Sequence, residues 1–461
     1  MKLSIDKVTA AVGGAVIHDI DIPIVISGVS IDSREDQTGK LFVALTGERA
    51  DGHDFVQAAF AAGASAALVE RDIEPETLSV PSGAIIKVES TRQALKDLAA
   101  HYIRTLSVKV VGITGSAGKT TTKDMIASVL SQKYHTLKTE GNFNNEIGLP
   151  LTVFRLEPHH EYAVIEMGMN HAGEIDRLSK LAPPDIAVIT NIGLAHVENL
   201  GSREGIFAAK SEIFNHMKDG AVAVLNGDDD KLQTLRGKLE RICYFGTDPD
   251  CFVRASDISL DGISSTGCMV KIGDTPSFRL SIPLPGRHIA LNALAAAAVG
   301  HIAGVSPQDI QRGIGGFTPT KMRMDISGCS YGGGEITVIN DCYNASPDSM
   351  KAALDILANA GGRKVCILGD MMELGDYARQ IHIDIAKHAC SKDIDMVVLV
   401  GERFGWGYEA IKSDCVARYF VDQQASLRYI DEIVRPGDTV LVKAARGMKF
   451  EQTVKHLRGG E

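Results

Sequence analysis

Short apolar runs, each followed by a cluster of small or polar residues, recur along the chain. The run at residues 108–114 is rich in β-branched side chains and leads through glycines into a helical stretch from Lys119 towards Leu130. Similar runs lie at residues 162–165, 186–189, 221–225, 336–339, 365–368, 396–400 and 439–442. Runs of this kind are typical of buried strands in parallel sheets covered by helices, so the pattern predicts an α/β fold.

A chain of 461 residues is too long for one hydrophobic core, and the pattern divides into three units. We expect a small N-terminal α/β domain over residues 1–86, with a strand at 41–45 and a helix at 58–67. A central parallel-sheet domain is expected over 87–318, and a C-terminal doubly wound, Rossmann-like domain over 319–461.

Within the central domain, the sequence predicts helices over residues 91–104 and 205–217, and an alanine-rich helix that ends near Val299. Residues 250–284 alternate polar and apolar side chains between Gly and Ser turns, which indicates a β-rich elaboration.

The composition excludes some classes of function. The net charge is −10 and no basic run offsets it, which argues against a nucleic-acid-binding protein. The eight cysteines form no C-x-x-C pair, a distribution typical of reduced thiols rather than of disulfides or a zinc site. No apolar run reaches membrane-spanning length and no leader pattern opens the chain, so we expect a cytoplasmic protein.

The glycine-rich segment after residues 108–114 predicts a phosphate site. Its candidate phosphate-binding residues are Gly115, Ser116, Ala117, Gly118, Lys119, Thr120 and Thr121. Backbone N–H groups at such a strand-to-helix turn bind anions, the lysine reaches the outer phosphates, and the hydroxyl beside it holds Mg²⁺. The first glycine of the standard motif would fall at Ile113, so the spacing is unusual. A tight turn without a ligand would explain the glycines, but not Lys119 followed by three threonines.

Polar residues also follow the later strands of the central domain. They are Glu166, Asn191, His196, Asn226 and Asp228. Because ligands bind at the carboxyl ends of parallel strands, we expect these groups to converge beside the phosphate loop. Glu166 is a candidate Mg²⁺ ligand, whereas histidine is an uncommon one. Taken singly, Glu166 could be a solvated carboxylate and His196 a hydrogen-bonded loop residue.

Other candidates are ambiguous from the local sequence alone. Lys210 lies on an amphipathic helix, where a lysine is normally solvated, and Asn292 could bind a base edge or satisfy a buried backbone group. The turn of Asp32, Ser33 and Arg34 could contact a polar ligand or only cap itself. Ser346 precedes Pro347 and could be only an N-cap.

Several motifs then occur in one order. They are T-G-S-A-G-K-T-T, G-N-F-N-N-E-I-G-L-P (residues 141–150), E-M-G-M-N, N-I-G-L-A-H, A-K-S-E-I-F and D-C-Y-N-A-S-P-D-S-M. Over nearly its whole length the chain resembles the Mur ligases, the ATP-dependent amide ligases of peptidoglycan precursor synthesis. The segments Y-N-A-S-P-D-S-M and L-G-D-M-M-E-L-G resemble the branch that adds D-alanyl-D-alanine to UDP-N-acetylmuramoyl-tripeptide.

The resemblance implies a mechanism and a set of roles. ATP would convert the tripeptide carboxylate to an acyl phosphate, and the amine of D-alanyl-D-alanine would then displace phosphate. Lys119 would hold the β- and γ-phosphates, Thr120 and Glu166 would ligate Mg²⁺, and His196 would assist at a second metal ion. Lys210 matches the lysine that related ligases carry as a metal-binding carbamate.

The remaining implied roles concern the substrates. Asn292 would contact adenine, Asp341 the ribose and Arg323 the γ-phosphate. Asp32, Ser33 and Arg34 would lie near the UDP-muramoyl end. The other implied substrate residues are Asn142, Asn145, Tyr343, Asn344 and Ser346.

One segment departs from the family pattern. Residues 443–446 read K-A-A-R where the family more often has K-G-S-R, so the two cations remain but a hydroxyl contact is in doubt. We expect no nucleic-acid or membrane partner, and a monomer. A nucleotide-gated switch would share the phosphate loop but not substrate motifs in both flanking domains. The third residue of the tripeptide, diaminopimelate or lysine, stays open.

Overall fold

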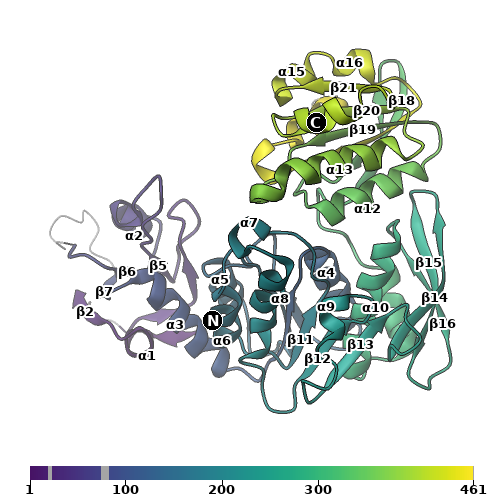
Figure 1. The fold of residues 1–461 in the computed structure, drawn as a ribbon. Helices are drawn as coiled ribbons and strands as arrows, with labels where there is room; N and C mark the ends of the chain where they lie inside the picture. The colour runs from purple at the N-terminus through teal and green to yellow at the C-terminus, as the bar shows by residue number, and fades with distance from the viewer. Residues whose placement is uncertain (19–22, 74–82, 460–461) are drawn as a thin grey trace.

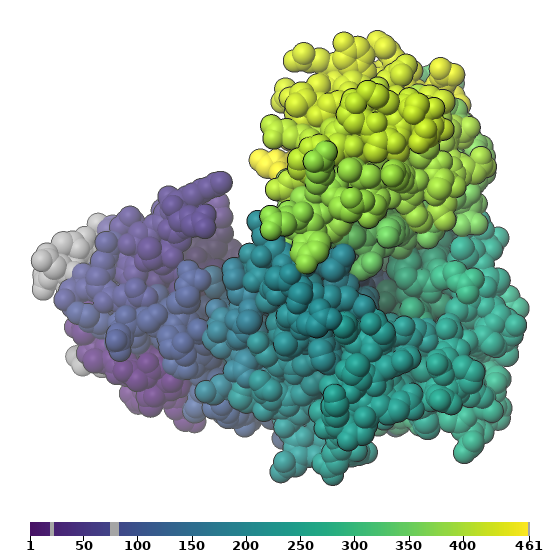
Figure 2. All heavy atoms as spheres, viewed as in Figure 1, coloured from purple at the N-terminus to yellow at the C-terminus, as the bar shows by residue number. Residues whose placement is uncertain are grey.

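The computed structural model describes residues 1–18, 23–73 and 83–459, which form three units in series (Figure 1). The central unit carries the N-terminal unit on one side and the C-terminal unit above it. Figure 2 shows a notch between the two outer units, open above the central one. None of the described helices is long and apolar enough to cross a membrane.

The N-terminal unit is a five-stranded sheet in the order β2-β7-β6-β5-β4. Its strands are β2 (Ala15–His18), β4 (Gly28–Ser30), β5 (Lys40–Val43), β6 (Ala66–Val69) and β7 (Ala84–Lys87), and its helices α1 (Ile5–Val12) and α2 (Val56–Ala61). A short pair, β1 (Leu3–Ser4) and β3 (Val25–Ile26), runs antiparallel beside it.

The helix predicted over residues 58–67 is wrong at its end. The chain turns at Gly63, where φ is +99°, and Ala66 already begins β6. Every residue of β6 is buried between neighbouring strands, and small side chains at such a position resemble a helix face in the sequence.

The central unit is a nine-stranded sheet in the order β16-β15-β14-β13-β12-β11-β8-β10-β9. Its strands are β8 (Lys109–Thr114), β9 (Thr136–Lys138), β10 (Tyr162–Glu166), β11 (Ile186–Ile189), β12 (Val222–Asn226), β13 (Ile242–Gly246), β14 (Val253–Asp261), β15 (Ser265–Ile272) and β16 (Phe278–Ile282). Strands β8 to β14 pair in parallel with their neighbours in the sheet. Strands β14 to β16 are antiparallel, as the alternating pattern at residues 250–284 predicts.

Helices of the central unit position the site. They are α3 (Thr91–Arg104), α4 (Lys119–Leu130), α5 (Gly148–Phe154), α6 (Glu174–Leu181), α7 (Val197–Leu200), α8 (Arg203–Ser211), α9 (Asp230–Gln233), α10 (Arg287–Ile302) and α11 (Pro307–Gly315). The alanines of α10 are buried, and the helix packs against α4. The single helix predicted over 205–217 is wrong: α8 starts at Arg203 after the Ser202 cap and ends at Ser211, and a 3₁₀ turn follows (Glu212–Phe214).

The C-terminal unit is a six-stranded sheet in the order β17-β18-β22-β19-β20-β21. Its strands are β17 (Asp325–Tyr331), β18 (Gly334–Asn340), β19 (Arg363–Gly369), β20 (Met396–Val400), β21 (Ala417–Phe420) and β22 (Asp438–Lys443). The helices are α12 (Pro347–Ala358), α13 (Ala378–Cys390), α14 (Phe404–Ile411), α15 (Gln423–Leu427), α16 (Ile430–Ile433) and α17 (Glu451–Leu457). All pairs are parallel except β17 with β18.

The linker between the central and C-terminal units is fixed at both ends. The Thr320 hydroxyl donates to the buried carboxylate of Asp124 on α4 (2.7 Å), and the Met324 N–H donates to Asp341 (3.2 Å). Met322 and Met324 adopt left-handed backbone conformations (φ +64° and +51°). The linker therefore joins the helix of the phosphate loop directly to the first loop of the C-terminal unit.

Candidate active site

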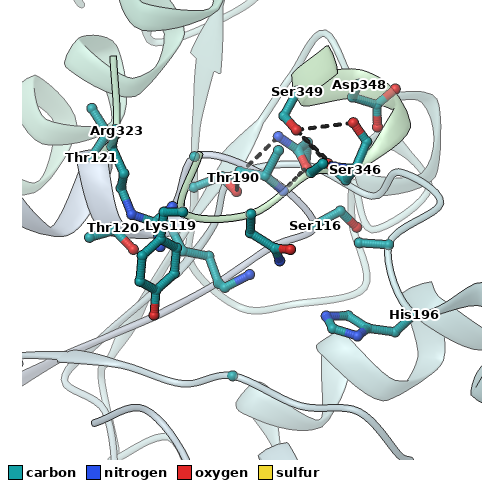
Figure 3. A pocket seen from close by; sticks show the side chains of 18 of the residues that line it. Ser116, Lys119, Thr120, Thr121, Thr190, His196, Arg323, Ser346, Asp348 and Ser349 are labelled. Atoms are coloured by element: carbon teal, nitrogen blue, oxygen red, sulfur yellow. Dashed lines mark hydrogen bonds between the residues drawn. The ribbon is translucent and has the colours of Figure 1, made fainter. Parts of the chain in front are cut away.

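A cavity of about 690 Å³ lies between the central and C-terminal units. The central unit contributes the phosphate loop, Asn142, Asn144, Asn145 and the segments after β10 and β11. The C-terminal unit contributes Asp341, residues 343–349 and 372–374, Lys443 and residues 445–447, and the linker contributes Arg323 and Met324. Figure 3 shows side chains from both units directed into this space.

The phosphate loop requires glycine at two positions. Gly115 (φ +150°) lies so close to β11 that a Cβ atom would come within 1.9 Å of the Thr190 hydroxyl oxygen. Gly118 (φ +78°) precedes α4, and a Cβ atom there would lie 2.7 Å from the Asn292 amide oxygen. Both the backbone conformation and the close neighbours therefore favour glycine at positions 115 and 118.

The segment after β11 holds this loop in place. The Ser116 N–H donates to the Asn191 carbonyl (3.1 Å), the Ala117 N–H donates to the Asn191 side chain (2.9 Å), and Thr190 donates to the Ala117 carbonyl (2.6 Å). The N–H groups of Ser116 and Ala117 therefore already have hydrogen-bond partners. The donors left for a phosphate are the first N–H groups of α4, from Lys119 onward, which have no partner within the helix.

Lys119 and Thr120 open α4 on the cavity wall. The Lys119 ammonium donates to the Gly115 carbonyl (2.8 Å), and burial lowers its pKa. The Thr120 hydroxyl donates to Glu166 (2.9 Å), and Asn144 donates to the other oxygen of that carboxylate (2.8 Å). A hydroxyl and a buried carboxylate are hard oxygen ligands, so this pair fits Mg²⁺.

His196 also lines the cavity, with its ring directed inward (Figure 3). Its Nδ1 is hydrogen-bonded to the carboxylate of Glu373, which lies in the C-terminal unit. This hydrogen bond holds the pKa of Glu373 below its ordinary value.

Lys210 is not the solvated lysine that its helix predicts. It is 1% exposed near the end of α8, and it is not among the residues that line the cavity. Burial lowers its pKa well below the ordinary value, and the charge of Lys119 lowers it further. The amine is therefore biased towards the neutral, nucleophilic form.

Three predicted nucleotide contacts line the cavity: Asn292, Arg323 and Asp341. Asn292 is buried, and its amide nitrogen has no hydrogen-bond partner beside the phosphate loop. The Arg323 guanidinium stacks over the Tyr343 ring (4.2 Å) on the side of the cavity where Thr120 and Thr121 lie (Figure 3). Asp341 forms an ion pair with the buried Lys443.

The predicted substrate residues fall into two groups. Asn142, Asn145, Tyr343, Asn344 and Ser346 line the cavity. Ser346 is also the N-cap of α12, where its hydroxyl and its N–H both donate to Ser349 (3.0 and 2.9 Å). Asp32, Ser33 and Arg34 are not among the lining residues.

The turn at Asp32 caps itself in this structure. Its carboxylate accepts from the N–H (3.1 Å) and the side chain (2.8 Å) of Arg34, and these bonds lower the pKa of Asp32 to about 2. The Arg34 side chain is 87% exposed. Asp228 does not converge on the site either, because its carboxylate accepts from Thr247 and Asp248.

Comparison with known proteins bears on what this cavity does. Three family models match the chain: "Mur ligase family, catalytic domain" at residues 25–103, "Mur ligase middle domain" at 113–300, and "Mur ligase, glutamate ligase domain" at 322–446. The UDP-N-acetylmuramoyl-tripeptide–D-alanyl-D-alanine ligase of Bacillus subtilis is 40% identical, over 99% of this chain and 98% of the relative. The chain belongs to the Mur ligase family.

Other relatives of this Mur ligase agree. The Escherichia coli enzyme of the same name is 34% identical over 94% of both chains. MurF from Acinetobacter baumannii superposes with a TM-score of 0.89 at 33% identity, covering 100% of this chain and 99% of that one. MurF from Thermotoga maritima in complex with ADP gives 0.81 at 29% identity, over 94% and 97%. The predicted family and the three-unit α/β fold are confirmed.

The sequence did not identify several cavity residues of this Mur ligase. Asn144, Glu373 and Lys443 lie within or beside quoted motifs, and each hydrogen-bonds a predicted site residue, but none was assigned a role. Their positions at strand ends or in a loop were the features of the sequence that could have indicated a role in the site. Their partners come from distant parts of the chain, and the sequence does not indicate such pairings.

Proposed function

We propose that the chain joins UDP-N-acetylmuramoyl-tripeptide to D-alanyl-D-alanine in peptidoglycan precursor synthesis, with conversion of ATP to ADP and phosphate. The observation that carries this proposal is the single cavity shared by a phosphate loop and the loops of the C-terminal unit. Full-length likeness to ligases of that name supports the choice of substrates.

In the first step, a tripeptide carboxylate oxygen attacks the γ-phosphorus of ATP, and the bond to ADP breaks. The Lys119 ammonium and the first N–H groups of α4 bind the phosphates and stabilise the charge that develops on them. Arg323 faces the same space and neutralises the γ-phosphate, while the unpaired Asn292 amide reaches the adenine.

Thr120 and Glu166 would hold Mg²⁺, which supplies charge neutralisation for the phosphates when bound. His196 and a carbamate on Lys210 would serve a second ion. The buried amine of Lys210 attacks CO₂, forming an N–C bond and losing a proton, and so becomes an anion with oxygen ligands. We propose this modification because a neutral amine fits the burial of Lys210 and a free ammonium does not.

In the second step, the amine of D-alanyl-D-alanine attacks the acyl phosphate, and phosphate leaves. Tyr343, Asn344 and Ser346 shape the dipeptide side of the cavity, and Asn142 and Asn145 contact the muramoyl peptide. Contact with the C-terminal unit excludes water from the activated carboxylate. Asp341 contacts the ribose.

We assign Asp32, Ser33 and Arg34 to the UDP-muramoyl end, which then extends from the cavity towards the N-terminal unit. The domain boundaries at 86/87 and 318/319, a monomeric state and a cytoplasmic location belong to the same proposal.

The test measures phosphate release with ATP, Mg²⁺ and both substrates, and then with each substrate omitted. We expect release to require both. Unchanged release without either one would reject the ligase in favour of a nucleotide-gated switch. Offering single amino acids in place of D-alanyl-D-alanine separates the proposal from a ligase that adds one residue.

A further inference from the structure

The C-terminal unit contacts the candidate metal-site histidine through Glu373. The two residues are 177 positions apart, and both line the cavity. An ionised carboxylate only accepts hydrogen bonds, so His196 Nδ1 carries a hydrogen, and in the neutral imidazole Nε2 then keeps its lone pair. The pairing thus selects the tautomer in which Nε2 is able to bind a cation.

Both partners adopt backbone conformations that side chains avoid. His196 has φ +66° and Glu373 has φ +61°. Such conformations cost about 1–3 kcal/mol each and persist where the surrounding structure imposes them, often at functional sites. Here they occur on both sides of one contact between two units.

Further contacts hold the two segments together. The Glu198 N–H donates to the Glu373 carbonyl (3.2 Å), and the Tyr377 hydroxyl donates to the Gly201 carbonyl (3.4 Å). Segment 373–377 therefore docks along α7, the short helix that begins just after His196.

The segment that carries Glu373 is anchored in the core of the C-terminal unit. The Met371 carbonyl accepts from Arg403 (2.8 Å), and the Met371 N–H donates to His382 Nε2 (3.0 Å). His382 is fully buried, and its Nδ1 donates to the Ala378 carbonyl (2.7 Å). The backbone two residues before Glu373 is therefore fixed to the core of the C-terminal unit.

We propose that Glu373 is a positioning residue that fixes the tautomer and orientation of His196 for a divalent cation, and that it does so only while the C-terminal unit is docked. The inference rests on the proposed function for the identity of the cation. A carboxylate behind a metal-binding histidine is a common arrangement, and its loss typically costs 10- to 100-fold in metal affinity or activity. In this chain the carboxylate comes from another unit, so docking and metal binding are linked.

The first measurement reads the tautomer directly. Full-length protein labelled with ¹⁵N-histidine is studied by NMR at pH 8 without nucleotide, and the His196 signals are assigned by their loss in His196→Gln. We expect wild-type His196 to carry its hydrogen on Nδ1, Glu373→Ala to lose that preference, and Glu373→Gln to give a mixture, because an amide donates or accepts. Asp376→Asn, an exposed carboxylate on the same loop, is the matched control and should resemble wild type.

The second measurement is Mn²⁺ binding, followed by EPR in the presence of a non-hydrolysable ATP analogue. We expect Glu373→Ala to weaken Mn²⁺ binding by about 10- to 100-fold and Asp376→Asn to leave it unchanged. A merely structural role would not move the tautomer. A wild-type tautomer and Mn²⁺ affinity in Glu373→Ala would overturn the inference, as would a doubly protonated His196 in wild type.

Ligase turnover of the wild type is measured in parallel. It distinguishes failure of the proposed function from failure of the inference about Glu373. If wild type does not require both substrates, the proposed function fails while the NMR and EPR results still decide the role of Glu373. If wild type is an active ligase and Glu373→Ala changes neither readout, only the inference about Glu373 fails.

Discussion

His288 makes the stability of this protein depend on pH in a predictable way. It lies at the start of α10 and lines the cavity opposite the C-terminal unit. Burial lowers its pKa from the ordinary value of 6.5 to about 4; the nearby charges of Asp341 and Asp355 oppose this shift, and that of Lys443 adds to it. The imidazole is therefore neutral in the folded protein at neutral pH.

The direction in which the free energy of unfolding changes with pH follows from proton binding. Between about pH 6.5 and 4 the unfolded chain binds a proton at His288 that the folded chain does not, so the free energy of unfolding falls as the pH is lowered. The difference between the two pKa values corresponds to about 3.5 kcal/mol at about 1.4 kcal/mol per pH unit. The side chain keeps partial exposure to the cavity, so we expect about 2 kcal/mol.

The variant for this test is His288→Gln, which keeps a neutral polar side chain that does not titrate. Urea unfolding of both proteins, followed by circular dichroism, is measured from pH 7.5 to 4.5. Other titrating groups are common to both proteins and cancel in the difference. Relative to the variant, wild type should lose about 2 kcal/mol between pH 6.5 and 4.5 and nothing above pH 7. If the difference in the free energy of unfolding between wild type and variant did not change with pH, His288 would not have a lowered pKa in the folded protein.

Three further predictions concern the phosphate loop and the buried lysine. Lys119→Ala should fold normally but lower turnover by about 100- to 1000-fold, because it removes a fixed cation from the phosphates; normal ATP turnover would reject the phosphate-loop assignment. Lys210→Arg keeps a long basic side chain but forms no carbamate, so turnover should fall by about 100-fold and not respond to added bicarbonate; a fully active variant would reject the carbamate. Gly115→Ala should weaken ADP binding by about 10- to 100-fold, measured by calorimetry, because the new Cβ atom meets the Thr190 hydroxyl. Gly141→Ala is its control, since a Cβ atom there meets nothing within 4 Å although φ is also positive; equal losses in both variants would show that backbone strain, not the clash, is responsible.

The strands of this fold were predictable where they are buried on both faces. The runs at 186–189 and 396–400 coincide with β11 and β20, because central parallel strands are continuously apolar. The edge strands β17 and β21 were missed because their side chains are mostly half-buried or exposed and their sequences carry no continuous apolar run. The overlong helix at 58–67 has a different origin, since small buried residues fit the helix and the strand period equally well.

The site was predictable up to the ends of the strands. Thr120, Glu166 and His196 lie together because parallel strands deliver their carboxyl ends to one edge, a consequence of topology alone. The rule says which residues reach the edge, but not what each contacts there. It gave no hint that Asn191 would occupy N–H groups of the phosphate loop, or that Glu373 would bind His196. The first contact joins segments 74 residues apart within the central unit, and the second depends on how two units dock.

The K-A-A-R segment shows how a departure from a family pattern is accommodated. Ala444 is fully buried, and its methyl group lies 2.6 Å from where a Cβ atom on Gly369 would stand, so the glycine at the end of β19 makes room for the alanine that follows the neighbouring strand β22. Lys443 and Arg446 both line the cavity. Both are already paired, Lys443 with Asp341 and Arg446 with Glu451 (3.1 Å). The ammonium of Lys443 also donates to the Asn344 carbonyl (3.0 Å), so its charge holds the substrate-side loop in shape rather than facing a ligand. Without the serine hydroxyl this cavity therefore has one hydrogen-bond donor fewer. The loop at residues 341–344 keeps its hydrogen bonds to Lys443.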